Sequence, residues 1–345
     1  MAETNEISRR KQDWLDLYSG KLKRLFVANV HDSGNPRPLL WWENADARVE
    51  YIVKDYHFRM ENIDKIPDSS IPYLDMITGT EIFAEAFGCK VFKPENNNPA
   101  AIPCVTNASE AAKLRTPKLE DTNLMILFEM ADKIRDRVGR DAIFKFPDMQ
   151  TPMDIAGLIW EKVDFFTAMY DAPEAIKELC HKIKSLMFDF LDRWIHRYGK
   201  EHIAHYPDYY VPEGITISED EIGAVSPEMF DAFFLNELNE FSERYGSVSV
   251  HSCAHAKHQW ENLKKIKSLR VLNLNLSSRD RVEAYACFKD ACVQFHGVFG
   301  GDDELFDMLD KIPKEARVAF WVDFGSLHDA VAFTKRFNEK TEHYL

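Results

Sequence analysis

The sequence predicts an α/β protein, specifically a (β/α)8 barrel with an N-terminal extension. The chain has 345 residues, of which 45% are hydrophobic and 29% are charged, so it can form one large core. A barrel of this type takes about 250 residues, and more with insertions. Short apolar runs alternate with longer segments of helical period, and repeated strand–helix units imply a parallel sheet. We therefore expect a single barrel domain over residues 1–345, in which residues 1–35 form a helical extension.

The candidate strands are eight short apolar runs, most of which lie between segments of helical period. They are Pro38–Trp42, Ile71–Met76, Ala142–Phe146, Ile215–Ser218, Val248–Ser252, Val271–Leu274, Val293–His296 and Val318–Val322. A doubly wound open sheet is the alternative architecture. No GxGxxG motif follows the first run, so dinucleotide binding has no support.

The helices between these runs have recognisable beginnings and ends. Residues 175–198 carry apolar side chains at spacings of three and four, which is typical of an amphipathic helix. Thr151 and Ser226 each precede a proline, the pattern of an N-cap followed by proline at the first helical position. Gly246 ends the helix that begins after Ser226. In a barrel, the chemistry lies at the carboxyl ends of the strands, where candidate residues are therefore sought.

The charge and the cysteine content exclude several classes of protein. The chain has 57 acidic and 43 basic residues and a net charge of −14, which is atypical of nucleic-acid or membrane-surface binding. No run reaches the roughly 18 apolar residues of a membrane helix, and residues 1–12 are polar, so we expect a cytoplasmic protein. A disulfide framework is not expected at this length and in a cytoplasmic protein. The six cysteines include no CxxC pair, so a zinc ribbon is not expected either.

Several segments, in their order along the chain, resemble the uroporphyrinogen decarboxylase superfamily. The strongest match is 217–230 (ISEDEIGAVSPEMF), and 146–157 resembles the proline-rich turn after the third strand of that family. Asp171–Glu174 is similar to the start of its next helix, and Val250–Cys253 resembles the strand that carries a His-x-Cys pair in its methyltransferase branch. The resemblance covers roughly residues 70 to 335 and implies a barrel with a cleft at the carboxyl ends of the strands.

The resemblance implies one of two chemistries. One branch of the superfamily decarboxylates the acetate side chains of a tetrapyrrole without a cofactor. The other moves methyl groups between a corrinoid and a thiol or another acceptor, often with zinc. The decarboxylase branch carries an arginine-rich segment after its first strand, where this chain has Trp41, Trp42 and Glu43. Because each bound carboxylate needs a cation, true uroporphyrinogen decarboxylation is disfavoured.

His251 and Cys253 are the first-choice zinc ligands. Residues two apart on a strand face the same side, and imidazole and thiolate bind zinc well. Zinc lowers the pKa of a bound thiol, which can then attack a methyl group on cobalt. The methyltransferase branch has a further cysteine after its last strand, which this chain lacks, so Asp323 or His296 is expected to replace it. The alternative is that His251 and Cys253 only fill the top of the barrel.

The remaining candidates also lie near predicted strand ends. Asp220, Glu221 and Asp75 are candidate catalytic carboxylates that act as acid, base or orienting group. A solvated loop or a helix cap is the alternative for each of them. The candidate substrate-binding residues are Trp41, Trp42, Tyr206, Tyr209, Tyr210, Asp148 and Gln150. Core or rim packing is the alternative for the aromatic members of this set.

These observations favour a methyltransferase that moves a methyl group between a small methylated substrate or thiol and a corrinoid (cobalamin) or corrinoid protein, with zinc. One alternative is a metal-free, decarboxylase-like lyase that acts on another substrate, and another is a non-catalytic binding barrel. Neither nucleic acid nor a membrane is expected as a partner, whereas a homodimer is compatible with the sequence.

Overall fold

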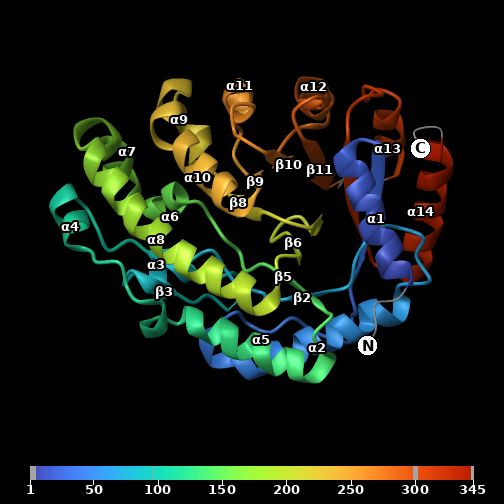
Figure 1. Ribbon diagram of the computed structural model, residues 1–345, viewed down its shortest axis with the longest axis horizontal. Coiled ribbons are helices and arrows are strands. Elements are labelled where there is room, and N and C mark those ends of the chain that lie inside the picture. Colours follow the sequence, from blue (N-terminus) through green and yellow to red (C-terminus); the bar gives the residue numbers. More distant parts are fainter. Residues whose placement is uncertain (1–4, 96, 298–301, 343–345) are drawn as a thin grey trace.

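The computed structural model describes residues 5–95, 97–297 and 302–342, and it has the expected α/β-barrel architecture (Figure 1). The parallel strands of the wall are β1 (Arg24–Val30), β2 (Tyr73–Asp75), β5 (Ile143–Lys145), β8 (Ile215–Ser218), β9 (Val248–Ser252), β10 (Leu269–Leu274), β11 (Val293–Gly297) and β12 (Val318–Phe324). The order β1-β12-β11-β10-β9-β8 forms one sheet, and β2 pairs with β5 in another.

Two junctions connect these sheets. Ser69 N, just before β2, donates a hydrogen bond of 3.0 Å to Phe26 O of β1. Gln150, after β5, pairs in parallel with Ser218 of β8. The wall is thereby continuous around the barrel.

The first strand differs from the prediction. Pro38–Trp42 forms no strand, whereas Arg24–Val30 (RLFVANV) is buried throughout and pairs with β12. The run ends in a short helical turn that begins at Trp42, and it lies outside the sheet. The N-terminal residues expected to be a helical extension thus contain helix α1 (Asn5–Ser19) and then a barrel strand. Each of the other seven predicted strands overlaps an observed one.

A short hairpin lies in the wall between β5 and β8. Its strands are β6 (His202–Ile203) and β7 (Tyr210–Val211), which the sequence did not indicate because each has two residues. β6 runs parallel to β5 through the pair Lys145 and Ile203, and β7 returns antiparallel to β6. The turn at 204–209 therefore lies at the carboxyl end of β5.

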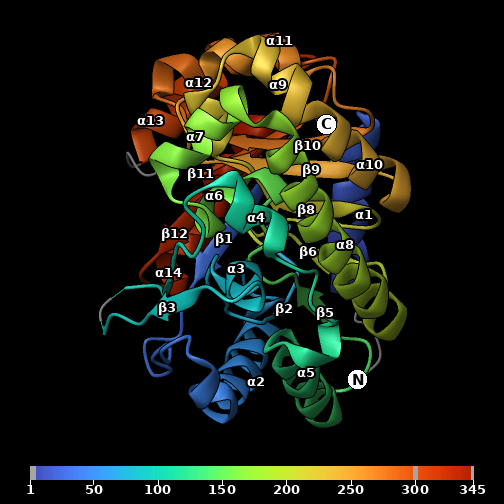
Figure 2. The same cartoon turned by 90° about the vertical axis from the view of Figure 1, so that its left-hand side faces the viewer.

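The helices surround the strands on the outside of the barrel, as Figures 1 and 2 show. Besides α1 they are α2 (Ala45–Asn62), α3 (Ile82–Ala86), α4 (Ala108–Lys113), α5 (Leu124–Val138), α6 (Pro152–Ile159), α7 (Lys162–Asp171), α8 (Pro173–Tyr198), α9 (Pro227–Phe233), α10 (Leu235–Tyr245), α11 (Trp260–Leu263), α12 (Ser278–Phe288), α13 (Asp302–Leu309) and α14 (Leu327–Thr341). The hairpin of β3 (Lys90–Phe92) and β4 (Ala100–Ile102) projects from the body of the molecule (Figure 2).

The predicted helix ends are confirmed. The side chains of Thr151 and Ser226 accept hydrogen bonds from the backbone N–H groups of Asp154 and Met229. The helix expected after Ser226 is divided at Phe234 into α9 and α10. Gly246 ends α10 with a φ of 92°, a left-handed conformation that glycine adopts without strain.

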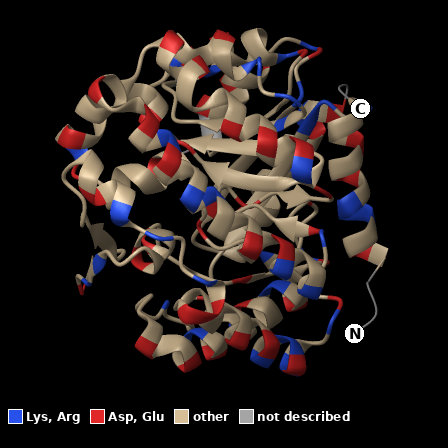
Figure 3. Ribbon diagram, turned by 60° about the vertical axis from the view of Figure 1, so that its left-hand side comes forward, with Lys and Arg blue, Asp and Glu red and all other residues tan. Residues whose placement is uncertain are grey.

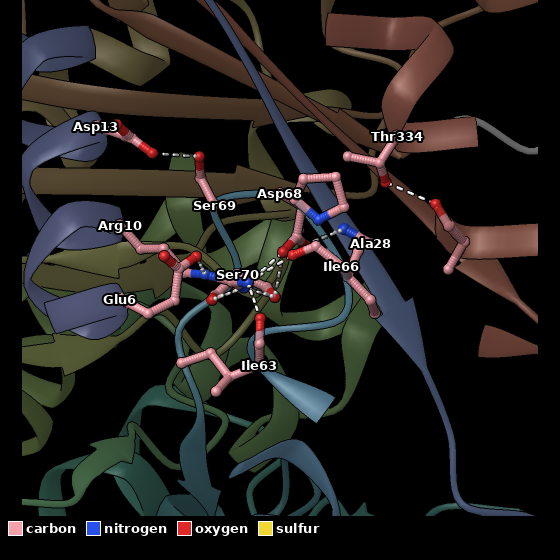
Figure 4. Close-up of polar contacts among 12 residues, drawn as sticks. Glu6, Arg10, Asp13, Ala28, Ile63, Ile66, Asp68, Ser69, Ser70 and Thr334 are labelled. Atoms are coloured by element: carbon pink, nitrogen blue, oxygen red, sulfur yellow. Dashed lines mark hydrogen bonds and ion pairs between the residues drawn. The ribbon is translucent and has the colours of Figure 1, made fainter. Parts of the chain in front are cut away.

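Helix α1 closes the amino-terminal end of the barrel. Trp14 and Leu17 pack in one buried cluster with Val27, Phe295 and other side chains that point into the barrel. Arg10, which is 1% exposed, donates to Asp68 Oδ1 at 2.5 Å and to Ile66 O at 2.7 Å (Figure 4). Asp68 in turn accepts a hydrogen bond of 2.8 Å from Ala28 N. A buried ion pair thus joins α1, β1 and the segment before β2.

The outer surface is polar and mixed in charge. Figure 3 shows acidic and basic residues interspersed over the outer helices. Within the described ranges, no helix is both long enough and apolar enough to cross a membrane.

Candidate active site

Alternation along the strands determines which side chains face the interior at the carboxyl end. Val27 of β1 and Ala319 of β12 belong to the inner cluster, so Asn29 and Asp323, each an even number of residues further on, also face inward. The same parity directs Asp75, Lys145 and His251 toward the interior. These residue types are polar or charged, whereas the lower layers are apolar. The alternation therefore predicts a polar cavity above the core.

A cavity of about 480 Å³ lies at this end of the barrel, a volume suited to a small ligand. It is lined by eight of the predicted residues: Asp75, Asp148, Gln150, Tyr206, Asp220, His251, Cys253 and Asp323. The structure therefore brings together the candidates from β2, β5, β8, β9 and β12 and from the β6–β7 turn.

His251 and Cys253 lie side by side on the cavity wall. His251 Nε2 and Cys253 Sγ are 3.0 Å apart, and His251 Nδ1 is 2.5 Å from Asn273 Oδ1. Since an amide oxygen only accepts, Nδ1 carries the proton and donates it to Asn273. The lone pair of Nε2 is then directed toward the thiol. This arrangement is typical of a histidine whose free nitrogen is prepared to bind a metal or a proton.

The environment of this pair is acidic. Burial, followed by the charges of Asp220, Asp148 and Asp154, raises the pKa of the Cys253 thiol to about 11. Burial lowers the pKa of His251 below its usual value. The protein alone therefore holds a neutral thiol and a neutral imidazole at pH 7, surrounded by carboxylates that favour an added positive charge.

A network of backbone hydrogen bonds fixes Asp220. Asp154, which is 2% exposed, accepts from Asp220 N at 2.9 Å and from Glu221 N at 3.0 Å. Asp220 Oδ1 accepts from Cys253 N at 2.5 Å, so the carboxylate lies against the loop that carries the thiol. Glu221 is paired with Lys162 instead and does not line the cavity. The adjacent residues Asp220 and Glu221 therefore point in different directions, and of the two Asp220 lines the cavity.

Asp75, at the end of β2, belongs to a network of ion pairs. Lys145 lies 3.1 Å from Asp75 Oδ2 and 2.7 Å from Asp208 Oδ1, and Asp208 also accepts a hydrogen bond from Tyr73. These contacts orient Asp75 but leave it bound to a cation of the protein. No lysine or arginine of the described ranges forms an ion pair with Asp148, and burial raises its pKa from 3.8 to about 6. Of these cavity carboxylates, Asp148 is the one suited to exchange a proton near neutral pH.

Asp323 lies at the end of β12, as predicted, and contacts the end of β1. Asn29 Nδ2 donates to Asp323 Oδ1 at 2.7 Å, and His31 Nε2 lies 3.4 Å from the same oxygen. Within the described ranges, no three His, Cys, Asp or Glu side chains stand in an arrangement that could hold a metal ion. The predicted ligand set of His251, Cys253 and Asp323 is therefore not preformed.

His296, which was predicted as a metal ligand, does not line the cavity. It lies one residue before the end of β11, but its neighbour Phe295 faces the barrel interior, so His296 faces the helices outside. It is 2% exposed, and its ring lies 5.3 Å from that of Tyr285 on α12. An imidazole in this position does not reach the cavity.

Four predicted substrate-binding aromatics are also corrected, because none of them lines the cavity. Tyr209 and Tyr210 are buried in the apolar cluster below it, where Tyr209 packs on Trp14 and Phe295. Trp42 donates to Glu85 Oε2 at 2.5 Å, and the ring of Trp41 lies 5.8 Å from Lys93 Nζ. The packing alternative holds for all four.

Several cavity residues had not been singled out from the sequence. Asn29 and His31 were missed because β1 was not identified as a strand. The alternation pattern around β12 could have indicated Trp321, which lies two residues before Asp323. His205 lies on the hairpin turn, and its Nε2 is 2.7 Å from Ser218 Oγ. No sequence pattern signals this contact, because it depends on how the turn folds back over β8.

The fold and the cavity define an α/β-barrel protein with imidazole, thiol and carboxylate groups at the carboxyl ends of its strands. The family model described as Uroporphyrinogen decarboxylase (URO-D) matches residues 67–298. Because this match spans more than half of the chain, the protein belongs to the uroporphyrinogen decarboxylase family, which confirms the family expected from the sequence. No protein with a curated description matches the chain.

Solved structures agree with the barrel fold. A methyltransferase from Methanosarcina mazei is similar with a TM-score of 0.67 and 13% identity, over 95% of this chain and 98% of that chain. A metallated homocysteine methyltransferase, MmuM from Escherichia coli, is 13% identical over 76% of this chain and 96% of its own, with a TM-score of 0.26. Bee venom hyaluronidase is 11% identical over 74% and 82% of the two chains, also with a TM-score of 0.26. Only the first score indicates a shared fold.

Proposed function

We propose that this protein is a methyltransferase that moves a methyl group between a small methylated substrate or a thiol and a corrinoid, with the help of zinc bound at His251 and Cys253. The observation that carries the proposal is the contact of 3.0 Å between His251 Nε2 and Cys253 Sγ on the wall of the cavity. Two further findings support the same class of reaction. The chain belongs to the uroporphyrinogen decarboxylase family, whose methyltransferase branch it resembles at Val250–Cys253, and its barrel is similar to that of a methyltransferase.

The residues around the pair fit a zinc ion in their chemistry. Imidazole and thiolate are the two ligand types that zinc prefers, and Asn273 directs the free nitrogen of His251 toward the thiol. The nearby charges of Asp220 and Asp148 oppose ionisation of Cys253 and favour a cation. Asp220, which bonds to Cys253 N, is our candidate for a third ligand. A bound zinc ion would lower the pKa of a coordinated thiol.

The chain's own groups would position the reactants and hold the proton. The nucleophile must lose its proton before it accepts a methyl group, and the carboxylate of Asp148 is a suitable acceptor on the cavity wall. Asn273 keeps His251 in one tautomer throughout. Tyr206 lies against His251 with ring centroids 4.7 Å apart and forms a wall for the methyl-bearing molecule. These groups orient the donor and limit the access of water.

Metal content and transfer activity test the proposal together. Protein purified without chelator is expected to hold about one zinc per chain by mass spectrometry of the metal, and the double variant His251→Ala, Cys253→Ala is expected to hold none. Transfer from methylcobalamin to a thiol, followed by the absorbance of the cobalamin, should be lost with the metal. Cys287→Ser on outer helix α12 is the matched control and should retain both properties. A metal-free wild-type protein, or undiminished transfer by the double variant, would contradict the proposal.

The alternative is a metal-free, decarboxylase-like lyase, a class of enzyme that the name of the family suggests. It requires cations at the cavity that are free to bind substrate carboxylates. Among the lining residues described, Lys145 and Arg59 are already paired with Asp208 and Asp55, so Arg37 is the remaining candidate. Release of carbon dioxide from candidate carboxylic acids by metal-depleted protein would favour this alternative. Binding without any turnover would favour a non-catalytic barrel.

A further inference from the structure

The charge of the cavity is unusual for a family whose name refers to a carboxylate-rich substrate. Among the described residues, six carboxylates line the cavity but only three lysine or arginine side chains do. The carboxylates are Asp55, Asp75, Asp148, Asp208, Asp220 and Asp323, and the cations are Arg37, Arg59 and Lys145. An excess of negative charge in a concave site attracts cations and repels anions.

The protein's own cations do not neutralise this excess. Lys145 is shared by Asp75 and Asp208, and Arg59 Nε lies 2.7 Å from Asp55 Oδ2. In the part of the chain that is described, Asp148 and Asp220 form no ion pair with a lysine or an arginine, and Asp323 pairs with the imidazole of His31, whose Nε2 lies 3.4 Å from its Oδ1. A zinc ion at His251 and Cys253 would not remove the excess, because the thiol would ionise and offset part of its charge.

Aromatic rings form a corner next to one of these carboxylates. The rings of Tyr206 and Trp321 are 6.1 Å apart and nearly perpendicular, at 75°. Trp321 and Asp323 are two residues apart on β12 and face the same side. Electron-rich ring faces together with a carboxylate are the surroundings that bind organic ammonium ions in proteins. Tyr206 also contacts His251, so this corner adjoins the proposed reaction centre.

Unsatisfied hydrogen-bond acceptors give an independent indication. Asn29 is 6% exposed, and its Nδ2 donates to Asp323, but no donor among the described residues reaches its Oδ1. Gln150 Oε1 is a second buried amide oxygen of the cavity without a donor. A buried acceptor that stays unpaired costs about 1–3 kcal/mol, so a ligand that donates N–H groups would be favoured here.

These observations converge on one class of ligand. Resting on the proposed function, we propose that the methyl donor is a small methylated ammonium ion that retains an N–H, held by Tyr206, Trp321 and Asp323, with Asn29 Oδ1 as hydrogen-bond acceptor. The positive charge on the nitrogen makes the amine a leaving group in the methyl transfer. A nucleophile, either a thiolate or a reduced corrinoid, forms a bond to the methyl carbon while the C–N bond breaks. Nitrogen keeps the electron pair of that bond and leaves as a neutral amine.

Equilibrium binding with matched small molecules tests the proposal without turnover. Trimethylammonium is protonated at neutral pH, since its pKa is about 10, like that of lysine. It is expected to bind, measured by calorimetry at constant ionic strength, at least tenfold more tightly than the neutral tert-butanol or the anion pivalate. Tetramethylammonium lacks an N–H and should bind more weakly than trimethylammonium. Equal binding of these molecules would overturn the proposal.

Variants place the ligand in the cavity. Asp323→Asn and Trp321→Leu should each weaken trimethylammonium binding by about tenfold or more, an amount equal to about 1.4 kcal/mol. Asp164→Asn, which removes an exposed carboxylate on α7, is the matched control for charge and should have no effect. Circular dichroism melting checks that each variant is folded. Binding that is unchanged in a folded Asp323→Asn variant would overturn the assignment.

The outcome is separable from that of the proposed function. The double variant His251→Ala, Cys253→Ala is expected to lose zinc and transfer activity but to keep trimethylammonium binding. If zinc and transfer are present but trimethylammonium does not bind, the substrate class is wrong and the methyltransferase stands. If trimethylammonium binds as expected but zinc and transfer are absent, the ligand class stands and the methyltransferase is wrong.

Discussion

Replacement of His296 by phenylalanine should make the protein more resistant to acid. His296 is 2% exposed, neither of its ring nitrogens has a hydrogen-bond partner among the described residues, and burial lowers its pKa from 6.5 to about 3. In the unfolded chain, His296 therefore binds a proton near pH 6.5, whereas in the folded protein it binds one only near pH 3. Stability from this group is complete above pH 6.5 and is lost as the pH falls toward 3. The loss is about 2 kcal/mol at pH 5 and reaches about 5 kcal/mol at low pH.

Urea unfolding at about pH 7.5 and about pH 5 measures this effect. The wild-type protein should lose about 2 kcal/mol more between these conditions than His296→Phe, since any packing cost of the larger ring is the same at both. His181→Gln, which removes an exposed imidazole on α8, should behave as the wild type. Identical pH dependence of the wild-type protein and the His296 variant would refute the reasoning and would reopen the question of what this histidine binds.

Two further predictions concern the framework of the barrel. Asp68→Asn leaves the buried Arg10 with the partly exposed Glu6 as its one counter-ion among the described residues, so the free energy of unfolding should fall by about 3 kcal/mol in a urea titration. A loss below about 1 kcal/mol would mean that the buried pair is unimportant. Gly214→Ala places a β-carbon within 2.1 Å of Ser247 Oγ at a φ of 117°. The free energy of unfolding should therefore fall by about 2 kcal/mol, with a measurable fall in melting temperature. An unchanged melting temperature would show that this turn is not constrained.

Much of the fold could be predicted from the sequence because local signals and the global architecture agree. The strands from Ile71 to Val322 are apolar runs between amphipathic helices, and the caps at Thr151 and Ser226 mark helix starts. β1 was missed because its run (RLFVANV) lies close to the amino terminus, within residues 1–35, which were interpreted as a helical extension.

The candidate site was predictable where it depended on position along a strand and unpredictable where it depended on a loop. Asp75, His251, Cys253 and Asp323 reach the cavity because strand ends and alternation determine their direction. His296 also lies near the end of a strand, but it alternates with the inward-facing Phe295 and therefore points outward. Glu221 and the pairing of His205 with Ser218 follow from backbone turns that no periodicity describes.

The hairpin of β6 and β7 has a consequence for how this scaffold can diversify. Its turn carries His205, Tyr206 and Asp208 into the cavity, yet it contributes little to the parallel strands that hold the barrel together. Changes in the length or sequence of this six-residue turn, 204–209, would alter the wall around a ligand. His251 and Cys253, at the end of β9, would stay in place. Related chains can thus acquire new ligand preferences by exchanging one connection, without any redesign of the framework.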